Sequence, residues 1–241
     1  MQKKTKESPK QQDDLSLKNK HLTIHKELYR QRTCFNARFF LYLCRIFTRT
    51  IVIMTKANKV LFITQEITPY VSESEMANIG RHLPQAIQEK GREIRTFMPK
   101  WGNINERRNQ LHEVIRLSGM NLIIDDTDHP LIIKVASIQS ARMQVYFIDN
   151  DDYFQNRLQT ADENGVEYDD NDSRAIFYAR GVLETVKKLR WCPDVIHCHG
   201  WMTALAPLYI KKAYKDEPSF RDAKVVFSVY EDDFKGDRKS V

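Results

Sequence analysis

The residues with the clearest chemical potential are two histidines near the end of the chain. His197 and His199 flank Cys198 in the apolar run DVIHCHG. If this run is a β-strand, alternate side chains share one face, so both imidazoles point the same way. Such a pair could bind zinc together with nearby Cys192, but no second pair of ligands at helical or strand spacing accompanies it. We therefore expect no metal site and no cofactor.

Aspartates and aromatic rings supply two further possibilities. Carboxylates could bind Mg²⁺ or accept hydrogen bonds from sugar hydroxyls, and flat aromatic faces suit stacking against sugar rings. The residues concerned are Asp149, Asp151, Asp152, Asp169, Asp170, Asp172, Trp101 and Tyr153. Turns and helix caps account for most clusters of aspartate, and packing accounts for most aromatic rings. On the residues alone we favour these structural interpretations.

Residue spacing excludes several kinds of catalytic site. Nothing resembles the Ser-His-Asp or Cys-His arrangement of nucleophilic catalysis. The 8 glycines include no pair separated by a single residue, so the sequence contains neither a G-x-G-x-x-G motif nor a Walker phosphate loop. The 4 cysteines form no C-x-x-C pair, which favours a reducing compartment, and we expect a cytoplasmic protein.

The positive charge is concentrated in the first 53 residues. They carry 12 Lys/Arg against 4 Asp/Glu, whereas the rest of the chain carries 26 against 28. The net charge of +6 therefore belongs to this leader, and we expect no nucleic acid as a partner of the body. Three interpretations of the leader stay open: a basic arm, a targeting segment, or sequence upstream of a true start at Met54. Arg45 and Arg49 interrupt its apolar stretch, so we expect no membrane span.

Charge and apolar periodicity together predict two regions: a leader over 1–53 that is disordered or lies upstream of the start, and a folded domain over 54–241 that we expect to be truncated at its C-terminus. Runs typical of buried strands occur at 60–63, 94–98, 194–200 and 224–230, and helical spacing covers 75–90, 172–190 and 201–214. Between 113 and 148, the runs VIRL, NLII, LIIKVAS and MQVYFID alternate with turn-like segments, which predicts a β-meander. The expected fold class is α/β, a Rossmann-like, doubly wound, mostly parallel sheet with an inserted β-meander.

The loops that follow the strands are the expected place for a ligand. In open α/β sheets, ligands bind beyond the carboxyl ends of the strands. This rule selects the loops 64–75, 149–171, 197–203 and 228–236. His197, His199 and Asp170 all fall within them.

Motifs in these loops resemble those of bacterial glycogen and starch synthases, the GT5-type retaining glycosyltransferases of the GT-B architecture. The segments that carry the resemblance are KVLFITQEITPY, DDNDSRAIFYARGVLE, PDVIHCHGWMTALAPLY and VVFSVYEDDFKG. They correspond to the family's S-E-x-x-P, D-N-x-x-R-F, H-x-H-D-W-H-T-A-L-A-P and T-V-H-N motifs, in order over about 59–236. The resemblance covers only the N-terminal half-domain and lacks the half that carries most of the sugar-nucleotide site.

The resemblance implies roles for particular residues. His199 aligns with a histidine that donates to the transferred glucose, and Asp170 and Asn171 align with a pair beside the substrate cleft. The implied catalytic residues are His199 and Asp170, and the implied substrate-binding residues are Asn171, Trp201, Thr203 and Tyr230. The implied partners are an α-glucan or maltooligosaccharide and a sugar nucleotide.

The chain departs from the family pattern where the family grips the donor pyrophosphate. There the family has a K-x-G-G loop at a helix N-terminus, which suits an anion. The aligned residues here are Ser72, Glu73, Ser74 and Glu75, and Ser72-x-x-Glu75 fits a capping box that would occupy the helix end. Further departures are Asn78 and Gly200 for aspartate, Met202 for histidine, and Tyr230 and Glu231 for His-Asn. We call the residues Ser72, Glu73, Ser74, Glu75 and Asn78 the degenerate donor loop.

Three hypotheses about function follow. The first is a glycogen/starch-synthase-like glycosyltransferase domain, weak or inactive alone, that moves glucose from ADP- or UDP-glucose to an α-1,4-glucan when a partner chain supplies the other GT-B half. The alternative is a non-catalytic glucan-binding or regulatory module. The third is a damaged gene product, whose exposed apolar edge would make it unstable.

Overall fold

The central strand of the sheet, β1 (Lys59–Thr64), is buried on both faces. The structure is a computed structural model that describes residues 58–231, so the predicted leader and the end of the predicted 228–236 loop lie outside the described residues. Every residue of β1 after Lys59 is buried. Helices cover both faces of such a strand, which is why the run VLFI shows no alternation of polar and apolar residues.

The sheet is mostly parallel, as the sequence predicts. Its order is β3-β5-β6-β2-β1-β7-β8, and β4 pairs with β5 outside this path. The bounds are β2 Glu93–Pro99, β3 His112–Glu113, β4 Met120–Ile124, β5 Thr127–Ile138, β6 Met143–Asp149, β7 Val195–His199 and β8 Lys224–Ser228. The five strands β6, β2, β1, β7 and β8 run parallel, whereas β3, β4 and β5 pair antiparallel.

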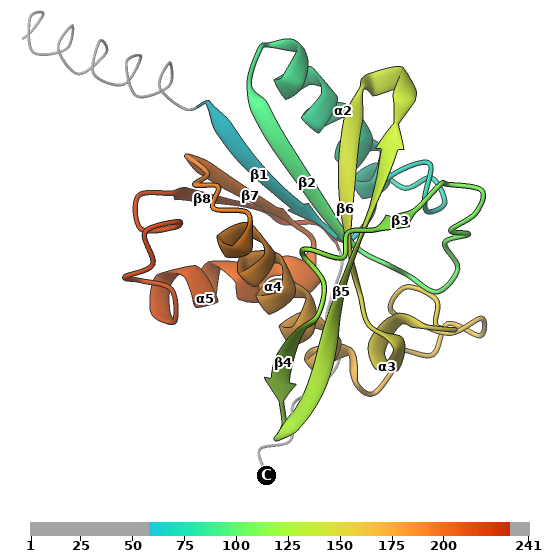
Figure 1. Cartoon of the computed structure of the whole chain (residues 1–241). Coiled ribbons are helices and arrows are strands. Elements are labelled where there is room, and N and C mark those ends of the chain that lie inside the picture. The colour runs from blue at the N-terminus through green and yellow to red at the C-terminus, as the bar shows by residue number, and fades with distance from the viewer. Residues whose placement is uncertain (1–57, 232–241) are drawn as a thin grey trace, which may run out of the picture. The chain divides into compact units, whose positions relative to one another are not determined.

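Helices lie on both faces of the parallel strands (Figure 1). The longer helices are α2 (Glu75–Glu89), α4 (Asn171–Lys188) and α5 (Leu205–Lys212); the short ones are α3 (Asp151–Phe154) and the 3-10 helices η1 (Gln139–Ala141) and η2 (Trp201–Thr203). α4 packs against α5 on one face, and α2 packs on the other. The two crossovers that contain α2 and α4 run in opposite directions along the sheet, so right-handed connections place these helices on opposite faces.

The predicted β-meander is correct in outline and wrong in two details. β4 and β5 form a hairpin whose two turn residues, Asp125 and Asp126, have φ values of 47° and 61°, the left-handed pair that a type I′ turn requires. β6 also pairs in parallel with β2, so it belongs to the main sheet. The VIRL run is a turn, closed by a 2.8 Å hydrogen bond from Leu117 N to Val114 O. Only His112–Glu113 pairs there, as β3.

The predicted helix over 201–214 is divided into η2 and α5. Gly200 has φ of 80°, and its carbonyl accepts hydrogen bonds from the backbone N–H of Thr203 at 3.1 Å and from its hydroxyl at 2.8 Å. This tight turn stops a single helix from starting at Trp201. α2, in contrast, runs through Pro84 without interruption. Within residues 58–231, no helix combines the length and the apolar character needed to cross a bilayer.

The chain reverses its winding direction at β1, which locates the expected ligand site. β1 has β2 on one side and β7 on the other, and the two neighbours are reached by separate crossovers. At such a switch point the loops after the two strands diverge and leave a crevice. The loops concerned follow Thr64 and His199.

Candidate functional site

The N-terminus of α2 is already occupied by polar side chains of the chain itself. Ser74 is the N-cap, with extended backbone, and its Oγ accepts a 2.9 Å hydrogen bond from Ala77 N. The same hydroxyl donates to the Glu66 carboxylate. The predicted cap at Ser72 is therefore wrong by two residues, because the helix begins at Glu75 and only Ser74 can reach its free N–H groups.

Carboxylates surround this helix end. Glu66 contacts the cap, Glu75 lies in the first turn, and Glu73 is exposed just before it. A helix N-terminus attracts anions because its N–H groups and dipole are positive, but here a hydroxyl and negative charges take that place. Asn78 is exposed on the next turn. Negative charge of this kind opposes the binding of an anion at the helix end, and the role of this segment as a degenerate donor loop stays a prediction.

The two histidines of β7 share one face, as their spacing predicts. Their ring centroids are 4.1 Å apart. Nε2 of His197 lies 2.9 Å from the Ser228 hydroxyl, and Nδ1 of His199 lies 2.8 Å from the Tyr230 hydroxyl. No group of three or more His, Cys, Asp or Glu side chains within residues 58–231 is arranged to hold a metal ion. The described residues therefore present the histidines as partners of hydroxyl groups.

His199 is buried and keeps one ring nitrogen unpaired. It is 2% exposed, and its ring packs against Phe62 at a centroid distance of 4.4 Å. Nε2 is among the few buried side-chain atoms of the described region with no hydrogen-bond partner. Burial, and secondarily the charge of protonated His197, lowers the pKa of His199 to about 4. The imidazole is thus neutral at pH 7, and its Nε2 has no hydrogen-bond partner within the described residues.

Tyr230 packs beside this histidine and is near enough to Glu75 of α2 to respond to its charge. Its ring is half-buried, and its centroid lies 5.9 Å from that of His199. Burial raises the pKa of Tyr230, and the nearby negative charge of Glu75 adds to the effect. The phenol therefore stays protonated at neutral pH.

Gln65 fills the space between β1 and the turn after β7. Its Oε1 accepts a 3.2 Å hydrogen bond from Met202 N, and a Cβ at Gly200 would lie only 2.5 Å from the same oxygen. Thr203 is fully buried, with its hydroxyl on the Gly200 carbonyl, and Trp201 is half-buried at the start of η2. Of these, Trp201 retains the surface that a ligand could contact.

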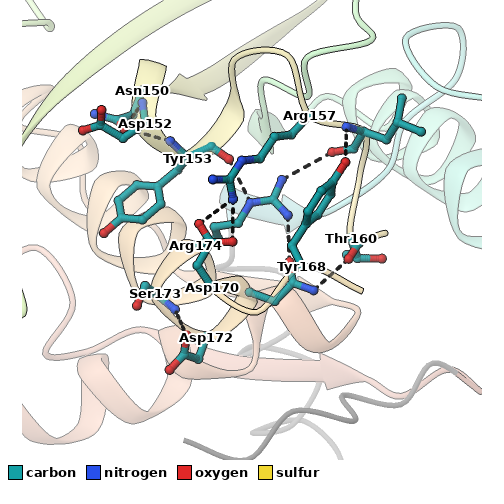
Figure 2. Close-up of polar contacts among 12 residues, drawn as sticks. Asn150, Asp152, Tyr153, Arg157, Thr160, Tyr168, Asp170, Asp172, Ser173 and Arg174 are labelled. Atoms are coloured by element: carbon teal, nitrogen blue, oxygen red, sulfur yellow. Dashed lines mark hydrogen bonds and ion pairs between the residues drawn. The ribbon is translucent and has the colours of Figure 1, made fainter. Parts of the chain in front are cut away.

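A second polar group surrounds the N-terminus of α4 (Figure 2). The Arg157 guanidinium contacts both carboxylate oxygens of Asp170, and each side chain of this pair is 33% exposed. The Asn171 side chain is buried; its amide donates to Thr160 O at 2.8 Å, and its oxygen accepts from Arg174 at 2.7 Å. Asp170 is therefore the more accessible member of the predicted Asp-Asn pair.

Arg174 anchors the loop that leads to Asp170. Its guanidinium is fully buried and donates to Tyr153 O at 2.9 Å, to Leu158 O at 3.3 Å and to Asn171. It also lies over the rings of Trp101, Phe154 and Tyr168, at 5.0–5.5 Å from their centroids. Burial lowers the pKa of Arg174 to about 10, so the side chain remains charged at neutral pH. This charge holds the loop by its carbonyl groups.

Two aspartates of the predicted clusters, Asp149 and Asp152, each pair with a basic side chain rather than with another aspartate. Asp149 lies 2.7 Å from the Lys134 ammonium, and Asp152 lies 3.0 Å from Nδ1 of His129. Burial raises the pKa of Asp149 despite this lysine. Trp101 and Tyr153 are both buried, and the Trp101 indole donates to Gln65 O at 2.8 Å. These findings agree with the structural interpretations favoured for the clusters and for the two aromatic rings.

Glu66 links the two polar groups. Its carboxylate accepts from Ser74 at the α2 cap and, at 3.5 Å, from the Gln159 amide in the loop before Asp170. Sequence reasoning matched Glu66 to a family motif but assigned it no role, and it missed Arg157 altogether. The i, i+3 spacing of Asn171 and Arg174 on a helix was a usable signal for their contact, whereas no local pattern connects Arg157 with Asp170.

Comparison with known proteins identifies relatives of this chain. The profile of the family described as starch synthase catalytic domain matches residues 59–240. The glycogen synthase of Pelodictyon phaeoclathratiforme is 41% identical over 179 residues, which are 73% of this chain and 37% of that protein. The glycogen synthase of Chlorobium limicola is 41% identical over 173 residues, 71% of this chain and 35% of that protein. The chain thus spans little more than a third of the length of these relatives.

A solved structure shares the fold. The catalytic domain of starch synthase IV from Arabidopsis thaliana, solved with ADP and acarbose, superimposes with a TM-score of 0.61 at 20% identity. The match covers 71% of this chain and 34% of that one. It confirms the α/β fold expected from the sequence.

Proposed function

We propose that this chain, which belongs to the family of starch synthase catalytic domains, is the glucan-binding half of a glycogen- or starch-synthase-type glucosyltransferase. Its acceptor would be an α-1,4-glucan or a maltooligosaccharide, and transfer of glucose from ADP- or UDP-glucose would be weak or absent when the chain acts alone. One contrast carries the proposal: His199, at the carboxyl end of β7, keeps a buried ring nitrogen without a hydrogen-bond partner in the described region, whereas the N-terminus of α2 is capped by Ser74, which contacts Glu66.

The glucan side of the site is supported by groups that suit hydroxyl-rich ligands. A buried nitrogen without a partner costs free energy, which a sugar hydroxyl at His199 would recover. Trp201 offers a half-buried ring, and Asp170 offers a partly exposed carboxylate that Arg157 holds in place. In the proposal His199 and Asp170 act at the reacting sugar. Asn171 and Thr203 are buried and hydrogen-bonded within the protein, so in the proposal they hold the backbone of the site in place and do not contact the sugar.

The donor side lacks the positive charge that the reaction requires. Retaining transfer depends on stabilising a diphosphate leaving group, which calls for cationic side chains or free N–H groups. At α2 the Ala77 N–H is capped by the Ser74 hydroxyl, and Glu66, Glu73 and Glu75 add negative charge. We therefore expect negligible affinity for ADP-glucose.

A partner chain that supplies the C-terminal GT-B half belongs to the same proposal. The chain corresponds to about a third of its relatives. Within residues 58–231, β8 is the last strand at its edge of the sheet, and the apolar residues on and after it are exposed: Val226 45%, Phe227 38% and Val229 82%. Exposed apolar surface of this kind is typical of an interaction site. A cytoplasmic location, where a glycogen synthase finds its substrates, is also part of the proposal.

Calorimetry and a transfer assay test this function on the full 241-residue chain. We expect maltoheptaose to bind, ADP-glucose not to bind, and no radiolabelled glucose to be incorporated into glycogen. His199→Gln should lower maltoheptaose affinity at least severalfold, whereas His82→Gln, at an exposed position of α2, is the matched control. Absence of maltoheptaose binding, or incorporation of label by the unmodified chain, would contradict the proposal.

A second experiment separates the enzyme half from the alternative, a non-catalytic glucan-binding or regulatory module. The C-terminal two-thirds of the Pelodictyon glycogen synthase is added to the chain, and glucose transfer is measured. Transfer that needs both pieces supports an enzyme half. Retained glucan binding without transfer supports the binding module, which the capped α2 N-terminus also favours.

A further inference from the structure

Two hydroxyl groups from β8 and the residues after it meet the two imidazoles of β7. β7 and β8 are parallel, with His197 opposite Val226 and His199 opposite Ser228. Each hydroxyl comes from two residues further along: Ser228 reaches Nε2 of His197 at 2.9 Å, and Tyr230 reaches Nδ1 of His199 at 2.8 Å. Side chains alternate along extended chain, so the same offset of two residues brings Ser228, the last residue of β8, to His197 and Tyr230, just beyond β8, to His199.

The direction of the hydrogen bond between Tyr230 and His199 follows from acid–base chemistry. A phenol, with a pKa near 10, is a stronger hydrogen-bond donor than a neutral imidazole N–H, and an imidazole nitrogen is a stronger acceptor than a phenolic oxygen. The strong arrangement is therefore O–H to Nδ1. Because burial keeps Tyr230 protonated and His199 neutral at pH 7, both partners are in the form that this arrangement needs.

This direction determines the state of the other ring nitrogen. A neutral imidazole carries one hydrogen, so a ring whose Nδ1 accepts must carry its hydrogen on Nε2. In His199 that nitrogen is buried and has no partner within the described residues. The rings of Phe62 and His197 pack against it, at centroid distances of 4.4 and 4.1 Å, and restrict its rotation.

We infer that Tyr230 is a positioning residue that donates its phenolic hydrogen to Nδ1 of His199 and thereby holds the tautomer whose Nε2–H is a donor to a ligand oxygen. The inference rests on the proposed function only where it names that oxygen as one of a sugar. Tyr230 itself then does not need to touch the glucan. Ser228 has the corresponding relation to His197, with the opposite ring nitrogen as its partner.

Nitrogen NMR on the full chain tests the inference directly. Two-bond ¹H–¹⁵N correlations at pH 7 distinguish a protonated from an unprotonated ring nitrogen, and loss of the signals in His199→Gln assigns them. We expect Nε2 of His199 to be protonated and Nδ1 to be unprotonated. In Tyr230→Phe, both shifts should move toward the average of two exchanging tautomers. A proton on Nδ1 in the unmodified chain, or unchanged shifts in Tyr230→Phe, would overturn the inference.

Ser228→Ala is the matched control, because it removes the other hydroxyl from the same strand region. It should change the ring signals of His197 and leave the His199 tautomer as it is. Maltoheptaose titrations of the same samples separate this inference from the proposed function. If the tautomer shifts as expected but no glucan binds, the proposed function fails and the tautomer assignment stands. If glucan binds but Tyr230→Phe changes neither the nitrogen shifts nor the affinity, the tautomer assignment fails and the proposed function stands.

Discussion

At the scale of single residues, Gly200 and Gln65 show how one side chain restricts its neighbour. Gly200 has φ of 80°, and an added Cβ would lie 2.5 Å from Gln65 Oε1 and 2.9 Å from Cε of Met76. Gln65 cannot simply swing away, because its Oε1 is held by Met202 N. Gly200 is therefore matched to Gln65, the residue that follows the adjacent strand β1.

Gly200→Ala should cost about 3 kcal/mol of unfolding free energy, because it combines backbone strain with overpacking. Gly165→Ala is the matched control: Gly165 also has positive φ, at 77°, but nothing lies within 4 Å of its Cβ position. That change should cost about 1 kcal/mol, from backbone strain alone. Urea denaturation measures both values.

A double substitution measures how much of this loss comes from the steric clash between position 200 and Gln65. Adding Gln65→Ala should recover at least about 1 kcal/mol of the loss in Gly200→Ala, since the two side chains compete for one space. Strict additivity of the two changes would show that Gln65 does not restrict position 200.

At the scale of elements, the ends of α2 and α4 determine the character of the site. α2 presents its own cap, whereas α4 begins at a buried asparagine whose partners are Arg174 and the carbonyl of Thr160. Arg174 also holds Tyr153 O and Leu158 O, so a single guanidinium organises the loop that carries Asp170. In the proposed function the first end disfavours a diphosphate, and the second holds the carboxylate of Asp170 in place.

The cap assignment yields a paired prediction. Ser74→Ala should lower the unfolding free energy by about 1 kcal/mol, because it leaves the Ala77 N–H without its acceptor. Ser72→Ala should change it by less than about 0.5 kcal/mol, since Ser72 is exposed and lies outside the helix. Thermal melts of the two variants give the comparison. Equal losses would restore the capping box at Ser72 that the sequence suggested.

At the scale of the whole molecule, the buried histidines make stability depend on pH. Burial lowers the pKa of both His197 and His199, the latter to about 4 from an ordinary value of 6.5. Between pH 4 and pH 6.5, the unfolded chain therefore binds more protons at His199 than the folded chain does. The free energy of unfolding is therefore highest above about pH 6.5, and it decreases as the pH falls toward 4. Asp149 opposes this trend, because its raised pKa favours the folded state as acid is added.

His199→Gln isolates the contribution of one ring. Between pH 7 and pH 5, the unmodified chain should lose on the order of 2 kcal/mol of unfolding free energy relative to this variant. Urea denaturation at the two pH values measures the difference, and His112→Gln, at an exposed position of β3, is the control. A constant difference between chain and variant at both pH values would contradict a buried, neutral His199.

The fold was predictable because its determinants are local and repeated. Unbroken apolar runs indicate buried parallel strands, and apolar residues three and four apart indicate packed helices. The prediction of a strand at VIRL was wrong because this run has no alternation of polar and apolar residues. The prediction of one helix over 201–214 was wrong because the positive φ of Gly200 and the Thr203 contacts form a turn. His199 lies at the carboxyl end of β7 and Asp170 at the N-cap of α4, in the loops that the rule on strand ends selected, and their roles in transfer stay predictions.

The sequence by itself determined the strand–helix alternation and the family, because both are recognisable from residue types and short spacings. Only the tertiary structure decided that Ser74 and Glu66 fill the α2 N-terminus, that Arg157 pairs with Asp170, and that Tyr230 meets His199. Such contacts depend on strand register and loop path, which no spacing along the chain encodes.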